Sequence, residues 1–241
     1  MVTESELDAV CPSRQTAHPS ISLRRGRVGA YAAVVAPIQF WLVATIAAVI
    51  RPGYDPLSQS LSDLAVGPNG WLQRLNLVVF GGMELGLVML VAAATVTNDV
   101  WKPNRLLMVA FAGCVMLAVF PSYEHQPTII GLLHVTSFVL VMVSLIVACF
   151  VVPKRLGPSF YPAWFRYISV EIGVASILIS ILICGHVLWS TLVGPTIFSG
   201  WAGLLERIDL GLLTLWLELF ALQLLVHYPP RPTVLGQQAG E

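Results

Sequence analysis

The chain has 241 residues, of which 56% are hydrophobic and only 11% are charged. A soluble domain usually carries about twice that share of charged residues, so the composition excludes an ordinary soluble globule and predicts an integral membrane protein. Its 13 basic and 13 acidic residues cancel, and we expect no nucleic-acid partner.

Six apolar runs of about membrane-spanning length follow one another along the chain. They predict an all-α bundle of six transmembrane helices at approximately residues 30–50, 75–96, 106–120, 132–152, 168–188 and 210–227. The expected organisation is a disordered tail at 1–28, the six-helix transmembrane domain at 29–228 and a second disordered tail at 229–241. Both tails are polar and lack apolar periodicity.

The basic residues predict the orientation, because Lys and Arg accumulate in short cytoplasmic connections. Ten of the 13 fall on the side of the N-terminus, and the other side has only Arg51, Arg74 and Arg207. We therefore expect a multi-pass protein of the cell membrane with both termini in the cytoplasm.

Two long outer connections flank the predicted spans. In the first, at 51–74, the turn residues Pro52 and Gly53 precede a predicted short helix at 58–66. Its apolar residues Leu57, Leu61 and Leu64 are spaced to lay that helix on the membrane surface as a lid. The last connection, at 190–209, is built in the same way, so short amphipathic helices are expected in both.

Three segments carry a family resemblance: RPGYDPLSQSLSDLAVGPNGW after the first span, GLLHVTSF opening the fourth and GLLERIDLG opening the sixth. In this order they resemble the DUF998 family of bacterial and archaeal integral membrane proteins, of uncharacterised function, over about residues 31–223. The resemblance implies a polytopic membrane protein. It also implies that positions recurring in the family correspond here to Tyr54, Asp55, Ser62, His134, Glu206 and Arg207.

Two carboxylates lie inside predicted spans, Glu84 in the second and Glu218 in the sixth. An ionised group near the bilayer centre costs about 2.5 to 3.5 kcal/mol, so each needs an explanation. At 1.5 Å per residue both lie about 12 to 14 Å from the outer ends of their spans. Neighbouring helices would let the pair share a proton. The alternative is a protonated glutamate that bonds to an adjacent helix.

The outer face gathers a second polar group, with Asp63, His134 and Glu206 among its members. Its histidines show no HxxxH or HExxH spacing, so we expect neither a metal nor a cofactor. Glu206 and Arg207 are expected to form a structural clamp in which an arginine pairs with Asp55 or Asp63. The alternative is that the outer arginines bind an anionic headgroup.

These residues favour a lipid- or isoprenoid-handling enzyme, similar to small membrane terpene cyclases in size and in its buried acids. The catalytic candidates are Glu84, Glu218, Asp63 and His134. The candidates for substrate binding are Tyr54, Asp55, Ser62, Trp41, Phe80, Arg207 and Trp216. A proton-coupled transporter and a scaffold or sensor subunit stay open as alternatives. The expected partners are the lipid bilayer and a hydrophobic small molecule, with a homo-oligomer or a membrane partner left open.

Overall fold

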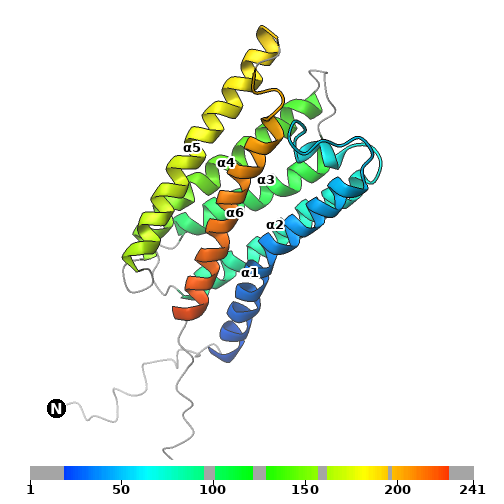
Figure 1. Ribbon diagram of the computed structural model, residues 1–241. Helices are drawn as coiled ribbons and strands as arrows, with labels where there is room; N and C mark the ends of the chain where they lie inside the picture. The colour runs from blue at the N-terminus through cyan, green and yellow to red at the C-terminus, as the bar shows by residue number, and fades with distance from the viewer. Residues whose placement is uncertain (1–18, 95–100, 122–128, 157–161, 195–196, 228–241) are drawn as a thin grey trace, which may run out of the picture.

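The computed structural model describes residues 19–94, 101–121, 129–156, 162–194 and 197–227. Within these ranges the chain is helical and contains no strand (Figure 1). The elements are α1 Pro19–Ile50, the 3-10 turn η2 Ser62–Ala65, α2 Gly70–Ala94, α3 Trp101–Val119, α4 Ile129–Leu156, α5 Ala163–Leu192 and α6 Ala202–His227. Of the predicted disordered tails at 1–28 and 229–241, residues 1–18 and 229–241 lie outside the described residues, as does the loop at 122–128, while residues 19–28 belong to α1.

Among the residues that the structure describes, four helices are long and apolar enough to cross a membrane, over Tyr31–Ile50, Ile129–Arg155, Ala163–Ser190 and Ala202–Val226. A shorter apolar helix covers Arg105–Val119. Large apolar side chains point outwards from these helices, and Ile181 and Leu188 on α5 are each 62% exposed. Such surfaces are stable in lipid and not in water. The protein is therefore a helical membrane protein.

Consecutive helices pack side by side, and α6 closes the ring by packing on α1 (Figure 1). Small residues allow the closest approach, between α1 and α2. A Cβ atom added to Gly29 would lie 2.4 Å from the carbonyl oxygen of Gly86, and one added to Gly86 would lie 2.7 Å from that of Gly29. The six helices thus enclose one core, which includes the rings of Phe40, Phe80 and Trp216.

Polar side chains join the helices inside this ring. Asn76 on α2 accepts a hydrogen bond of 2.7 Å from the Gln39 amide on α1 and donates one of 3.0 Å to the Phe40 carbonyl. The Trp41 indole donates to Thr214, which joins α1 to α6. The Trp216 indole donates to Ser169, which joins α6 to α5. These bonds satisfy polar groups that lipid cannot.

Several helices begin earlier than the apolar runs predicted. α2 begins at Gly70 rather than 75, and α6 at Ala202 rather than 210. Their first turns are polar, which hydropathy alone assigns to loops, but these side chains bond within the protein. As a result Glu84 lies 14 residues and Glu218 16 residues along their helices, about 21 and 24 Å at 1.5 Å per residue. Both lie deeper than predicted, and still at similar depths.

Candidate functional site

Residues 51–69, which we call the lid, cover the end of the bundle where α1 ends and α2 begins (Figure 1). The predicted helix at 58–66 is wrong in length, since only η2 forms. Ser60 and Asp63 explain this, because the Ser60 N–H donates to the Asp63 carboxylate and the Asp63 N–H donates to the Ser60 hydroxyl. The predicted position on the membrane surface is also wrong: Leu61 and Leu64 are 4% and 2% exposed and belong to the core.

Two arginines hold the lid, Arg51 at its first residue and Arg74 in the first turns of α2. The Arg51 guanidinium donates to the carbonyls of Asp63 and Val66. The Arg74 guanidinium donates to the Ala65 carbonyl at 2.8 Å. Backbone oxygens of the lid therefore accept hydrogen bonds from both cations.

Arg207 ties the lid to α6. Its guanidinium donates to the carbonyls of Gln59 and Gly203, both at 2.8 Å, and to the Tyr54 hydroxyl. Tyr54 in turn donates to the Ser60 carbonyl at 2.7 Å, and burial raises the pKa of its hydroxyl.

The predicted clamp thus joins the two expected segments through different partners. The Glu206 carboxylate accepts the Leu61 N–H at 3.1 Å, and the bonds described for Arg207 go to carbonyls and to Tyr54 rather than to Asp55 or Asp63. Asp55 lies exposed in the lid, where the Ser58 hydroxyl, followed by the Leu57 N–H, lowers the pKa of its carboxyl.

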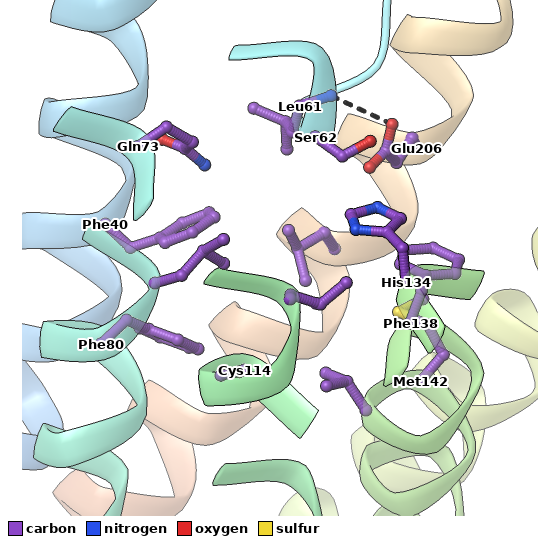
Figure 2. A pocket seen from close by; sticks show the side chains of 14 residues that line it. Phe40, Leu61, Ser62, Gln73, Phe80, Cys114, His134, Phe138, Met142 and Glu206 are labelled. Atoms are coloured by element: carbon purple, nitrogen blue, oxygen red, sulfur yellow. Dashed lines mark hydrogen bonds between the residues drawn. The ribbon is translucent and has the colours of Figure 1, made fainter. Parts of the chain in front are cut away.

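Below the lid lies a cavity of about 50 Å³, which we call the inner cavity (Figure 2). Its polar groups come from four elements: Ser62 of the lid, Gln73 of α2, His134 of α4 and Glu206 of α6. The other lining residues are Phe40, Leu61, Leu77, Phe80, Cys114, Leu117, Phe138, Val141, Met142 and Leu210. The inner cavity is therefore polar at the lid and apolar farther in.

The imidazole of His134 has a fixed tautomer. Its Nδ1 lies 2.7 Å from the Phe120 carbonyl oxygen, and because a carbonyl only accepts, Nδ1 must carry the proton. The other ring nitrogen, Nε2, is left for proton exchange. In Figure 2 the His134 ring and the Glu206 carboxylate lie on the same side of the inner cavity, next to Ser62.

A larger opening of about 320 Å³ lies between α4 and α5, and we call it the α4–α5 cleft. It is lined by Ser58, Ser60, Ser62, Asp63, His134, Val135, Phe138, Ile183, His186, Val187, Ala202, Leu205 and Glu206. Ser62, His134, Phe138 and Glu206 line the inner cavity as well. The same polar groups therefore face both spaces.

Glu84 lies beneath the inner cavity in a chamber of about 10 Å³, near the minimum volume for one water molecule. The chamber shares Phe80, Cys114 and Val141 with the inner cavity. Glu84 is 5% exposed, and neither carboxylate oxygen has a hydrogen-bond partner among the described residues. It therefore makes no hydrogen bond to Glu218, which is half-buried on α6, so the shared proton stays a prediction.

The remaining candidates separate into two groups. Asp63 lines the α4–α5 cleft, and Phe80 lines both the inner cavity and the Glu84 chamber. Trp41 and Trp216 are absent from the lining of these three spaces and bond between helices instead. Their role in substrate binding stays a prediction.

Two polar residues are not among the site candidates predicted from the sequence. Gln73 lines the inner cavity, and its spacing with Phe80 and Glu84 marks one face of α2, which is the signal that could have found it. Asp209 is fully buried on α6 and accepts a hydrogen bond of 2.7 Å from Ser180 on α5. No cluster of three metal-ligating side chains occurs in the part of the chain that the structure describes.

The fold and the site define a polytopic helical membrane protein with a lidded cavity at one end of its bundle. The chain belongs to the family described as protein of unknown function (DUF998), whose family model matches residues 34–223. No curated protein and no solved structure matches the chain. The matched region runs from α1 to near the end of α6, so it contains the lid, the inner cavity and the cleft. The family resemblance read from the sequence is confirmed.

Proposed function

We propose that the protein is an enzyme of the cell membrane that acts on a lipid or isoprenoid held between its helices. In this proposal all six helices cross the bilayer and both termini lie in the cytoplasm. The closed ring supports six crossings, since consecutive helices pack side by side and α6 returns to α1. The lid end is then the outer end, as the distribution of basic residues predicts.

The observation that carries the proposal is the polar wall that the α4–α5 cleft and the inner cavity share. Val135 and Val187, at the cleft, are 56% and 54% exposed, so its apolar edge faces the lipid. Ser62, His134 and Glu206 form the polar wall common to both spaces. A lipid can therefore enter the α4–α5 cleft sideways from the bilayer, with its head at this wall and its chain among the apolar side chains of the cleft.

Acid and base chemistry suits this wall. His134 Nε2 and the Glu206 carboxylate would exchange a proton with the substrate head, and Asp63 stands in the adjoining cleft. A placed acid or base contributes roughly 10² to 10⁴-fold to a rate. Glu84 would serve the apolar end, where a neutral carboxyl can protonate a hydrophobic chain. The role of Glu218 as its partner is kept as part of the proposal.

The test compares lipid extracts by untargeted mass spectrometry. Cells make the wild-type protein, the Glu206→Gln form, the Glu84→Gln form, or none of them. A Glu171→Gln form is the matched control, because Glu171 is exposed on α5 and outside the site. We expect a compound that appears with the wild type and the control and is lost with Glu206→Gln. Identical extracts in all strains would contradict the enzyme.

The second candidate is a proton-coupled transporter, which the buried position of Glu84 favours. A carboxyl without a hydrogen-bond partner beneath the substrate cavity can bind and release a proton as the cavity fills. A transporter moves a compound without changing it. Identical extracts, together with proton uptake by proteoliposomes that Glu84→Gln abolishes, would support this candidate over the enzyme.

A further inference from the structure

The charge of the site is one-sided. Three carboxylates, of Asp63, Glu84 and Glu206, line the inner cavity, the α4–α5 cleft or the Glu84 chamber, and so do two histidines. The described lining residues of the three spaces include no Lys or Arg. An occupant therefore meets hydrogen-bond acceptors in spaces whose described lining contains no permanent cation.

The arginines of the lid end do not supply the missing charge. Arg51 and Arg74 donate to carbonyls of the lid, and Arg207 donates to two carbonyls and to the Tyr54 hydroxyl. These bonds direct the three guanidinium groups to the backbone, and none of the three residues lines the spaces below. The alternative reading of these arginines as a headgroup site therefore has no geometric support in the described residues.

Two carboxylates bound the path of an occupant. At the polar wall, one oxygen of the Glu206 carboxylate accepts a hydrogen bond from the Leu61 N–H. Glu84, at the apolar end, has no hydrogen-bond partner for either oxygen among the described residues. A phosphate or carboxylate head would bring further acceptors and negative charge beside Asp63 and Glu206, and the described lining residues include no Lys or Arg to offset them. A donor head would instead bond to the other Glu206 oxygen.

We propose that the site takes a lipid whose head donates hydrogen bonds and carries no phosphate or carboxylate, namely a long-chain amine or alcohol. This inference rests on the proposed function, because it names the substrate class of the same site. The head bonds to Glu206 and Ser62, His134 Nε2 accepts from it, and the chain lies along Val135 and Phe138 in the α4–α5 cleft, whose volume is about 320 Å³.

The experiment measures binding to the purified full chain in zwitterionic detergent, by native mass spectrometry. The probes are tetradecylamine, tetradecanol and tetradecyl phosphate, which share one chain and differ in the head. We expect tetradecylamine to bind one per chain and at least tenfold more tightly than tetradecyl phosphate. If tetradecanol binds equally well, the site recognises a hydrogen-bond donor; if it binds weakly, the site recognises positive charge. Both results support the proposal and separate the two sources.

The variants locate the binding. Glu206→Gln keeps an oxygen for the Leu61 N–H and removes the charge, so we expect at least a tenfold loss of tetradecylamine affinity. Glu171→Gln, with the same chemical change on the exposed surface of α5, should leave that affinity within twofold. If Glu206→Gln does not fold, the comparison of the three heads on the wild type decides alone.

Tetradecyl phosphate that binds as tightly as tetradecylamine would overturn the proposal, and so would absence of binding by both donor heads. Failure here is distinct from failure of the proposed function. A Glu206-dependent product in cells, together with tighter binding of the phosphate probe, would support the proposed enzyme and contradict a substrate with a donor head. Selective binding of the amine or alcohol without any product would support the proposed binding site and contradict the enzyme.

Discussion

Replacing Arg207 by methionine tests how the lid is held. Methionine keeps the unbranched apolar stem of the side chain and removes every donor. The substitution deletes two bonds to the lid, at the Gln59 carbonyl and the Tyr54 hydroxyl, and one within α6, at the Gly203 carbonyl. It also removes the guanidinium that lies 5.6 Å from the centre of the Tyr54 ring. The lid should therefore open more often while the bundle stays folded.

The expected size of the effect follows from the two hydrogen bonds that Arg207 donates to the lid. A hydrogen bond to a charged group contributes about 1.5 to 3 kcal/mol, so the pair contributes about 3 to 6 kcal/mol. Arg207 is partly exposed, and water replaces part of this free energy when the bonds break, which leaves about 1.5 to 3 kcal/mol. Since each 1.4 kcal/mol is a factor of ten, the open lid should become about 10- to 150-fold more populated.

Hydrogen exchange read by mass spectrometry measures this population. Amides in residues 57–66 should exchange about 10- to 150-fold faster in Arg207→Met, and those in 139–150 of α4 should exchange as in the wild type. Exchange at 57–66 in Arg207→Lys should be intermediate, because the lysine ammonium keeps the positive charge but lacks the several planar N–H donors of a guanidinium. Unchanged exchange at 57–66 would contradict the claim that Arg207 holds the lid on α6. An equal acceleration in α4 would mean that the substitution loosens the whole bundle.

Three further predictions concern glycines and a tyrosine. Gly203→Ala places a Cβ atom 2.1 Å from a lid carbonyl oxygen, so the free energy of unfolding should fall by about 1 to 3 kcal/mol, while Gly200→Ala, with open space around it, should stay within about 0.5 kcal/mol in a thermal unfolding assay. Gly86→Ala, whose Cβ atom would lie 2.7 Å from an α1 carbonyl oxygen, should lower the unfolding temperature and Gly82→Ala on the same helix should not; equal midpoints would contradict the close contact. Burial raises the pKa of Tyr54, so the folded state holds more protons than the unfolded state at high pH, and stability should fall as pH rises above about 10. Tyr54→Phe should flatten that decline in unfolding temperatures measured from pH 9 to 11.5, and an unchanged slope would place the titration elsewhere.

The sequence alone was enough for the helices and for several site residues. Apolar runs predicted six helices because burial in lipid requires them, and the family resemblance pointed to His134 and Glu206, which line the inner cavity. The free-energy cost of a carboxylate inside a membrane span indicated Glu84, which is buried in the structure. The apolar runs begin later than α2 and α6 do, because the first turns of these helices contain the polar residues Gln73 and Glu206, which line a cavity inside the protein.

The rest depended on packing between distant segments. Leu61 and Leu64 have the spacing of a surface helix, and nothing local shows that the lid turns them into the core. Trp41 and Trp216 resemble walls of a cavity, but their indole groups bond to Thr214 and Ser169 on neighbouring helices. The α4–α5 cleft depends on the order of the helices around the ring, which periodicity does not encode.

The most direct test of the central claim is to map where a lipid chain lies. A hexadecylamine with a diazirine in mid-chain is photolysed with the protein in nanodiscs, and adducts are located by peptide mass spectrometry. We expect saturable adducts in residues 135–138 of α4 and 183–187 of α5, which line the α4–α5 cleft, and we expect tetradecylamine to compete with them. Adducts confined to the lipid-facing surface of α1, at Ile38, Leu42 and Val49, would contradict a lipid inside the bundle.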